Sequence, residues 1–324
     1  MKFKPLGRSG VQVSALCFGT MSFGGDADEA MSAQMYQACR DAGINFFDCA
    51  DQYNKGKAEE ILGRLMKGHR EDLVITTKCY NPAREDINAR GTSRRHVTRA
   101  VEASLKRLQT DRVEVLFLHH YDKRTPLEES VRALEDLVRS GKVLYPAVSN
   151  WSAWQTQRAV DLEERNDWAR LQLIQPMYSL VKRQAEVELL PMAEANGIGV
   201  IPYSPAAAGI LSGKYSGNAT GRLKTNKMYE ARYGEPWVFE VAEKFVGFCK
   251  QKGLHPVSAA VAWVGAHPAI TAPIVGARSL EQLRDSLNAV NVDMTPALRA
   301  EITALSPTPA PATDRLEELK PPKA

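Results

Sequence analysis

Residues 44–53, INFFDCADQY, combine a short apolar segment with two polar side chains that are common in catalysis. The first four of these residues predict a short buried strand. Asp48 follows this strand directly, and Tyr53 lies five positions further on. A carboxylate at the exit of an apolar strand, with a phenol in the loop after it, is an unusual pairing. The stretch is therefore a candidate functional site.

Two further apolar segments end in the same way. LVITT (73–77) is followed by Lys78, and VEVLFL (113–118) is followed by His119. Taken alone, Asp48 would suit a turn or a cap, Lys78 a solvated strand end and His119 a structural histidine. In a parallel α/β architecture, however, the C-terminal ends of the strands face one side, where active sites are built. The joint occurrence predicts that an acid, an amine and an imidazole meet there.

The rest of the chain alternates between strand-like and helix-like segments without a shift in composition. A hairpin is predicted over residues 2–15, around a GRSG turn. Pro236 begins a helix, and the pattern leaves open whether a helical segment at 256–265 continues it. We expect strands at residues 15–20, 44–47, 73–77, 113–118, 143–148, 171–174, 199–202 and 271–275. We expect the other helices at residues 28–42, 58–67, 93–108, 126–140, 154–165, 184–196 and 279–290.

Eight strand–helix units in about 280 residues favour a (β/α)8 TIM barrel of the α/β class with a short N-terminal β-hairpin. We expect residues 1–305 to form this single domain and residues 306–324 to form a Pro-rich tail. No GxGxxG follows the first strand, and neither a P-loop nor HExxH is present. A loop of roughly thirty residues after Tyr203 is long enough to suggest a functional role.

Composition and charge exclude several classes of protein. The net charge is +4 and no block of Lys or Arg exceeds two residues, so nucleic acid is not an expected partner. The five cysteines show no CxxC spacing, which favours free thiols in a reducing compartment. The N-terminus has no apolar h-region and no segment is long enough to cross a membrane. We therefore expect a cytoplasmic protein without a membrane partner; the oligomeric state stays open.

The residues at the strand ends suit acid–base chemistry on a carbonyl group. A free phenol titrates near ~10, and a neighbouring ammonium such as Lys78 is expected to lower the pKa of Tyr53. Asp48 would pair with Lys78, because an unpaired buried charge is costly. A carbonyl oxygen held between Tyr53 and His119 could be protonated as negative charge develops. The reaction then needs a hydride, which a nicotinamide cofactor supplies.

With these residues, the chain resembles the aldo-keto reductase family from about residue 3 to residue 290. FFDCADQY, ITTK and FLHHYD resemble the family motifs that carry its four catalytic residues. The resemblance implies that Asp48, Tyr53, Lys78 and His119 are catalytic. It also implies a (β/α)8 barrel closed by the hairpin and the use of NADPH, sometimes NADH, without a Rossmann domain. The substrate would be a small-molecule aldehyde or ketone, reduced to an alcohol or formed from one.

The resemblance also implies a cofactor site. Ser149 and Asn150 in VSN, with Gln175, would hold the nicotinamide carboxamide, and Tyr203 in YSP would stack on the ring. Arg278 favours NADP(H), since a guanidinium pairs well with a phosphate. The remaining residues implied are Thr20, Met21 and Asp48 near the nicotinamide, Ser204, Pro205, Ala206 and Lys214 at the pyrophosphate, and Gly276 and Gln282 with Arg278 around the 2′-phosphate. The chain departs from the family pattern at Cys49, Ala206 and Ser286.

Two other functions stay open. Some relatives of this fold are β subunits of potassium channels, which suggests a cofactor-binding regulatory subunit with weak catalysis. The pair His119 and His120 could suggest a metal-dependent hydrolase, but no Cys, Asp or Glu lies at a matching ligand spacing, and no metal is expected. Phe23, Tyr80 and Trp151 suit either the wall of an apolar substrate pocket or ordinary packing.

Overall fold

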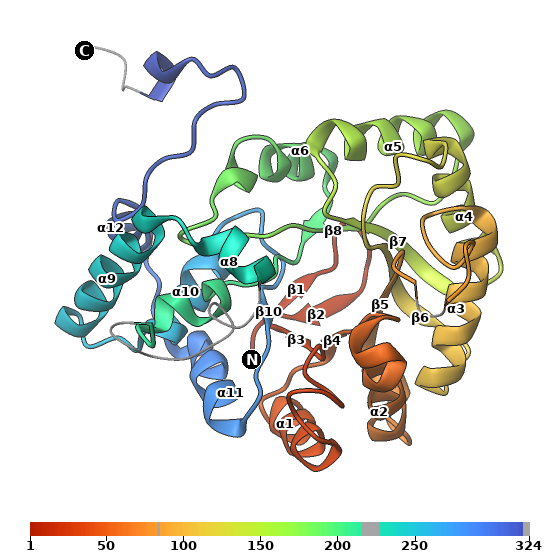
Figure 1. Ribbon diagram of the computed structural model, residues 1–324, viewed down its shortest axis with the longest axis horizontal. Helices are drawn as coiled ribbons and strands as arrows, with labels where there is room; N and C mark the ends of the chain where they lie inside the picture. The colour runs from red at the N-terminus through yellow and green to blue at the C-terminus, as the bar shows by residue number, and fades with distance from the viewer. Residues whose placement is uncertain (83–84, 216–226, 320–324) are drawn as a thin grey trace.

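The computed structural model describes residues 1–82, 85–215 and 227–319 and contains one sheet of eight parallel strands (Figure 1). The strands pair in the order β10-β3-β4-β5-β6-β7-β8-β9. The strands form from the apolar segments of the sequence, and all of their residues are buried except the exposed Leu144 and the half-buried Tyr145. The strands are β3 (Cys17–Gly19), β4 (Phe46–Asp48), β5 (Val74–Cys79), β6 (Val113–Leu118), β7 (Val143–Ser149), β8 (Leu173–Gln175), β9 (Gly199–Val200) and β10 (Ile274–Val275).

The sheet closes on itself between its two end strands. Val200 forms a parallel bridge with Ile270, and the amide of Thr271 donates to the carbonyl of Val200 at 2.9 Å. The amide of Ile274 donates to the carbonyl of Pro202, also at 2.9 Å. These bonds complete a (β/α)8 barrel, which confirms the predicted fold class.

Helices surround the strands, as the predicted alternation requires (Figure 1). Ser93, the first residue of a predicted helix, is an N-cap that accepts a hydrogen bond from the amide of His96, and Ser152 forms a capping box with Gln155. The helices around the barrel are α1 (Glu29–Asp41), α2 (Lys57–Leu65), α3 (Arg94–Leu108), α4 (Leu127–Arg139), α5 (Ala153–Asn166), α6 (Leu189–Asn196), α10 (Pro256–Gly265) and α11 (Leu280–Leu287). The described residues also form α8 (Lys227–Tyr233), α9 (Pro236–Gln251), α12 (Pro296–Thr303) and the short 3-10 turns η1 (Tyr53–Gly56), η2 (Arg70–Asp72), η3 (Gln184–Glu186), η4 (Ala207–Ser212), η5 (Asn288–Asn291) and η6 (Leu316–Leu319).

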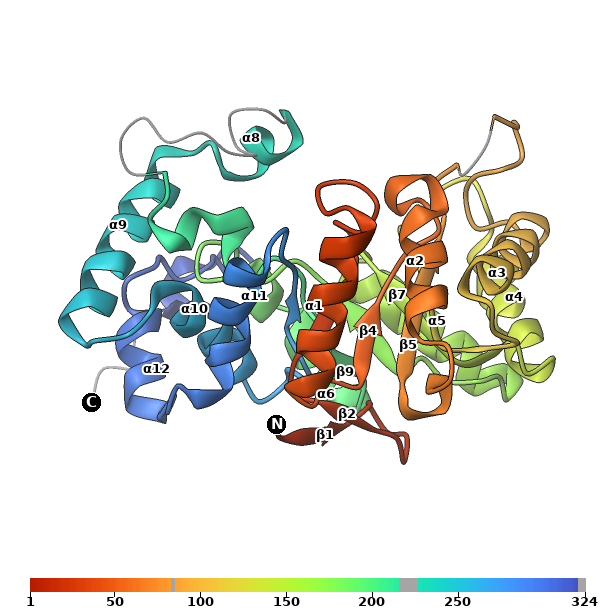
Figure 2. The ribbon, with the colours of Figure 1, turned by 90° about the horizontal axis from the view of Figure 1, so that it is seen from below.

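The predicted hairpin is confirmed as an antiparallel pair, β1 (Phe3–Pro5) and β2 (Gln12–Ser14). It lies across one end of the barrel, and the loops that follow the strands lie at the other end (Figure 2). Leu6 and Val13 are fully buried in the same apolar cluster as Phe117 inside the barrel. The hairpin thus plugs the N-terminal end, and access to the interior comes from the C-terminal ends of the strands.

The predicted single helix at 184–196 is wrong. The chain forms the turn η3, leaves helical geometry near Glu188, and begins α6 at Leu189. Pro191 explains the break, because it has no N–H to donate to the carbonyl of residue 187, and its ring would collide with that carbonyl. The residue is tolerated only within the first turn of α6.

The segments at 236–251 and 256–265 are two helices, not one. Gly253 adopts a left-handed φ of +67° after the end of α9, and Pro256 begins α10. The predicted loop after Tyr203 also contains regular structure, namely η4 and α8. Part of that loop, residues 216–226, lies outside the described residues.

The predicted boundary between a barrel domain and a tail at residue 305 stays a prediction. Near it, the guanidinium of Arg183 donates to the carbonyl oxygens of Ser306 and Pro307 at 3.2 and 3.3 Å. After α12 the chain leaves the barrel (Figure 1). Within the residues described, none of the helices has the length and apolar character needed to cross a membrane.

The close packing of α2 against α3 depends on Gly63. A Cβ atom at this position would lie 2.6 Å from the carbonyl oxygen of Arg107, so the backbones would have to separate. We expect Gly63→Ala to lower the free energy of unfolding by about 1–3 kcal/mol, as overpacking does. The matched control is Gly247→Ala in α9, where an added Cβ meets no atom within 4 Å and should stabilise the protein by roughly 0.5–1 kcal/mol. Urea unfolding measures both, and equal stability of the two variants would contradict the close approach.

Candidate active site

The centre of the site is a buried ion pair between neighbouring strands. Asp48 ends β4 and Lys78 lies one residue before the end of β5. The Lys78 ammonium donates to Asp48 Oδ2 at 2.6 Å and to the carbonyl of Cys49 at 2.7 Å, and its side chain is fully buried. It also lies 3.3 Å from the hydroxyl of Tyr53. The ammonium therefore has three oxygen partners and points at the phenol.

The other carboxylate oxygen of Asp48 is held by side chains of β5 and β8. Asp48 Oδ1 accepts from Thr76 Oγ1 at 2.7 Å and from Gln175 Nε2 at 3.0 Å. These bonds satisfy the carboxylate and fix its orientation, which a buried charge requires. Gln175 lies 127 residues from Asp48 in the sequence. This residue, predicted to bind the cofactor, therefore also holds the side chain of Asp48.

Tyr53 stays protonated at neutral pH. Burial raises the pKa of Tyr53 to about 12, while the Lys78 ammonium lowers it and the Asp48 carboxylate raises it. The expectation that Lys78 brings the phenol below its ordinary pKa is therefore wrong in this structure: its charge acts in the expected direction, but desolvation of the phenolate is the larger effect. For Lys78 burial lowers the pKa, and the neighbouring Asp48 carboxylate and Tyr53 more than reverse this, so the amine stays charged.

His119 is a neutral imidazole beside the phenol. Its ring centroid lies 6.3 Å from that of Tyr53 in an edge-on arrangement. Burial, followed by the Lys78 charge and by His120, lowers the pKa of His119 to about 2. His120 stacks on His119 with centroids 5.0 Å apart and planes 9° apart. Of the two, His119 is the histidine next to Tyr53 and Lys78.

A second hydrogen-bonded chain connects strands β7, β8 and β9. Asn150, in a left-handed conformation with φ of +59°, donates from Nδ2 to Ser149 Oγ and to the carbonyl of His119, both at 3.0 Å. Ser149 Oγ donates to the carbonyl of Gln175 at 2.9 Å, and the Tyr203 hydroxyl donates to Asn150 Oδ1 at 2.8 Å. Four residues predicted to hold the nicotinamide end thus form one connected group.

A cavity of about 660 Å³ opens at this end of the barrel. Its volume lies within the roughly 300–1,000 Å³ that is usual for ligand sites. Its lining includes three of the four predicted catalytic residues, Asp48, Tyr53 and His119. It also includes these predicted cofactor residues: Met21, Ser149, Asn150, Gln175, Tyr203, Ser204, Pro205, Ala206, Lys214, Gly276, Arg278 and Gln282.

Two predicted residues do not line the cavity. Lys78 lies beneath Asp48 and Tyr53, as its bonds require. Thr20 is fully buried and donates to the carbonyl of Asp48 at 3.0 Å, so the structure places it behind the site. Ser286, one of the departures from the family pattern, lies on the wall near Gln282.

The structure also places residues in the cavity that the sequence did not single out. Gln52 lies inside the stretch between Asp48 and Tyr53, and its amide is 3.4 Å from His119 Nδ1. Tyr229 and Arg232 come from α8. Neither residue of α8 carried a recognisable signal, because that segment belongs to a polar loop without clear periodicity.

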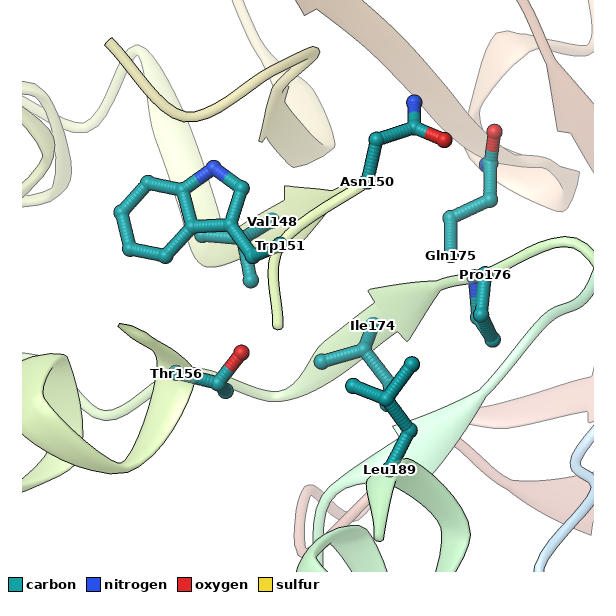
Figure 3. Close-up of a pocket in the computed structure, with 8 residues that line it drawn as sticks. All are labelled: Val148, Asn150, Trp151, Thr156, Ile174, Gln175, Pro176 and Leu189. Carbon is teal, nitrogen blue, oxygen red and sulfur yellow. The ribbon is translucent and has the colours of Figure 1, made fainter. Parts of the chain in front are cut away.

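The suggested aromatic walls are packing residues instead. Phe23 is fully buried against Phe18, and Tyr80 packs edge-on against His120 at 5.1 Å. Trp151 lines a separate cavity of about 10 Å³ behind the wall that carries Asn150 and Gln175 (Figure 3). That cavity has room for about one water molecule, and the buried indole N–H of Trp151 points to no hydrogen-bond partner among the described residues.

A search for possible metal sites found no group of three His, Cys, Asp or Glu side chains within residues 1–82, 85–215 and 227–319. All five cysteines are buried free thiols. Burial raises the pKa of Cys49 and Cys79 above the usual range, which fits side chains that pack rather than react.

Comparison with known proteins gives one family and several full-length relatives. A family model described as the Aldo/keto reductase family matches residues 15–307. The "Uncharacterized oxidoreductase YrpG" of Bacillus subtilis (strain 168) is 39% identical over 324 residues, 97% of this chain and 98% of that protein. A "Probable voltage-gated potassium channel subunit beta" of Oryza sativa subsp. japonica is 36% identical over 93% of this chain and 94% of that protein. The "Versiconal hemiacetal acetate reductase" of Aspergillus parasiticus is 32% identical over 91% of this chain and 94% of that protein.

The buried pair should show strong energetic coupling. Asp48→Asn and Lys78→Met each leave one buried charge without its partner, so each should lower the free energy of unfolding by roughly 3–5 kcal/mol. The double variant removes both charges, so its loss in the free energy of unfolding should be clearly smaller than the sum of the losses in the two single variants. Denaturant unfolding of the three variants measures the coupling.

The control cycle uses the exposed pair Glu164 and Arg170, which are joined at 2.7 Å. Glu164→Gln and Arg170→Met should couple by no more than about 1 kcal/mol. Strictly additive effects at Asp48 and Lys78 would contradict the buried ion pair.

Proposed function

This chain belongs to the aldo/keto reductase family, and we propose that it is an NADP(H)-dependent oxidoreductase that interconverts aldehydes or ketones with alcohols. The family and the relatives named as an oxidoreductase and a reductase make oxidoreduction the general reaction class. The observation that carries the proposal is the contact between the Lys78 ammonium and the Tyr53 hydroxyl, at the floor of a cavity that also exposes His119.

In the reductive direction Tyr53 would donate a proton to the carbonyl oxygen. Its raised pKa keeps the phenol protonated before the reaction, and the Lys78 ammonium stabilises the phenolate that forms afterwards. Asp48 keeps that ammonium charged and oriented. Tyr53 regains its proton from solvent, and in the oxidative direction the same groups act in reverse.

His119 would hold the carbonyl oxygen without carrying a charge. The Gln52 amide N–H can only donate, so His119 Nδ1 accepts and Nε2 carries the proton. The neutral imidazole can then donate one hydrogen bond to the oxygen on which negative charge develops. His119 therefore orients the carbonyl, while Tyr53 supplies the proton.

The cavity suits a dinucleotide in its residue chemistry. Asn150, with Ser149 and Gln175, offers amide and hydroxyl groups at the catalytic end, and Tyr203 offers an aromatic ring beside them. Lys214 and Arg278 offer positive charge further along. NADP(H), when bound, exchanges a hydride with the carbonyl carbon.

A second function is supported by a different observation. The chain is 36% identical to a protein named as a probable voltage-gated potassium channel subunit beta. On this alternative the cavity binds the same cofactor, but its occupancy is sensed by a membrane partner and turnover is weak. Co-purification with a channel protein together with negligible reductase activity would favour it.

The main proposal is tested by Tyr53→Phe. We expect turnover of aldehydes and ketones, followed by NADPH absorbance, to fall by about 10²–10⁴, the usual contribution of a general acid. NADPH affinity, measured by quenching of tryptophan fluorescence, should stay within a factor of two, because the phenol is assigned to the substrate. The control Tyr36→Phe removes only a hydroxyl bonded to His69 and should leave turnover intact. A Tyr53→Phe variant with normal turnover would remove the proposed proton donor.

The preference for the phosphorylated cofactor is tested at Arg278. Among the described residues its side chain forms no ion pair, so it is available to a phosphate. We expect Arg278→Met to weaken NADPH binding by roughly 10- to 100-fold, as loss of a charge-assisted contact does, and NADH binding by less than about threefold. Arg284→Met, at an exposed position of α11, the helix that follows Arg278, is the control. Equal losses for both cofactors would contradict the assignment.

A further inference from the structure

One cation of the cavity has no role in the proposed function. The described residues that line the cavity include three lysine and arginine side chains, Lys214, Arg232 and Arg278. The first and last are assigned to the phosphate groups of the cofactor. Arg232 is left over, and it comes from a different element, α8, which lies at the end of the barrel opposite the hairpin (Figure 2).

Arg232 is held in place by the packing of its own helix. Tyr229 and Tyr233, on the same helix, are buried, and the Tyr233 hydroxyl lies 3.7 Å from Met177 Sδ. The Arg232 guanidinium lies over the Tyr229 ring at 5.8 Å, within range of a cation–π contact. The charge is thus presented to the cavity by an anchored helix.

This charge acts on the catalytic end of the cavity. Burial, and after it the Arg232 guanidinium, lower the pKa of His120, which stacks on His119 at 5.0 Å. Burial raises the pKa of Tyr203 and the same guanidinium lowers it. Arg232, His120 and Tyr203 line the same cavity, which also holds His119 and the proposed nicotinamide end.

The cavity has no acid committed to Arg232. Two acidic residues line it in the part of the chain that the structure describes. Asp48 is paired with Lys78 at 2.6 Å, and Asp285 lies 3.8 Å from His255. Arg232 forms no ion pair with any described carboxylate. A guanidinium in this position suits a carboxylate or a phosphate, which it can bind through two parallel hydrogen bonds.

We propose that Arg232 binds an anionic group of the substrate, so that the preferred substrates are aldehydes or ketones that also carry a carboxylate or a phosphate. The inference rests on the proposed function, since it assigns the carbonyl to Tyr53 and His119. The anion then lies at Arg232, in the same cavity as Tyr53 and His119. The same guanidinium chemistry would suit the diphosphate of the cofactor, and the test separates the two sources.

The test compares two aldehydes of the same shape, 4-carboxybenzaldehyde and its neutral methyl ester. The wild type should reduce the acid with a kcat/KM about 10-fold or more above that of the ester. Arg232→Met should lower kcat/KM for the acid by roughly 10- to 100-fold, mainly through KM, and reverse the preference. Arg232→Lys keeps a point charge, so its kcat/KM for the acid should lie between the values of the wild type and of Arg232→Met. Arg158 is an exposed arginine on α5, and Arg158→Met should change kcat/KM for neither substrate.

Two other results would overturn the inference. Equal losses for acid and ester in Arg232→Met would mean that the residue supports the helix and not the substrate. An NADPH dissociation constant raised about 10-fold, measured by fluorescence titration, with no change in the acid-to-ester ratio would assign the guanidinium to the cofactor diphosphate. Reduction of the ester without preference for the acid would defeat the inference alone. Failure to reduce any aldehyde, neutral or charged, would defeat the proposed function and this inference with it.

Discussion

The buried ammonium of Lys78 is the constraint on which the site depends. A charge removed from water is costly unless it is paired and hydrogen-bonded. Lys78 meets this requirement with Asp48, the carbonyl of Cys49 and the hydroxyl of Tyr53. Asp48 in turn is satisfied by strands β5 and β8, through Thr76 and Gln175. Strands far apart in the sequence must therefore keep their relative register for the pair to be satisfied, and that same register places the phenol at the cavity floor.

Burial and charge act on the phenol in opposite directions, and both suit the proposed role as a proton donor. Burial disfavours the phenolate and raises the pKa of Tyr53 to about 12, so the phenol keeps its proton at neutral pH. The neighbouring ammonium favours the phenolate, so the anion left after the proposed proton transfer would be stabilised. His119 is kept neutral by burial and by the same ammonium, with a pKa of about 2. Burial thus moves the pKa values of Tyr53 and His119 in opposite directions, although the two side chains lie side by side.

The sequence predicts the barrel and the meeting of Asp48, Tyr53, Lys78 and His119 at one end of it, because both rest on local patterns. Short apolar segments, N-caps such as Ser93 and the polar residues at strand ends are visible over a few positions. Other features depend on contacts between distant residues. The bond from Gln175 to Asp48 and the burial that sets the pKa of Tyr53 exist only after folding. The break at Pro191 was visible in the sequence, but helical periodicity on both sides hid it.

The position of α8 shows why specificity is harder to predict than chemistry. Its helix is short, and its place over the cavity comes from the burial of Tyr229 and Tyr233, not from a periodic apolar face. The ends of the barrel strands hold the proposed catalytic residues, whereas the described residues of α8 add side chains to the same cavity without a contact to the ion pair beneath. Relatives with names as different as a reductase and a channel subunit match nearly the whole of this chain. A scaffold closed at one end by a hairpin, with the loops that follow the strands at the other, permits such different roles: a loop element can change what the cavity accepts while the buried ion pair beneath it stays satisfied.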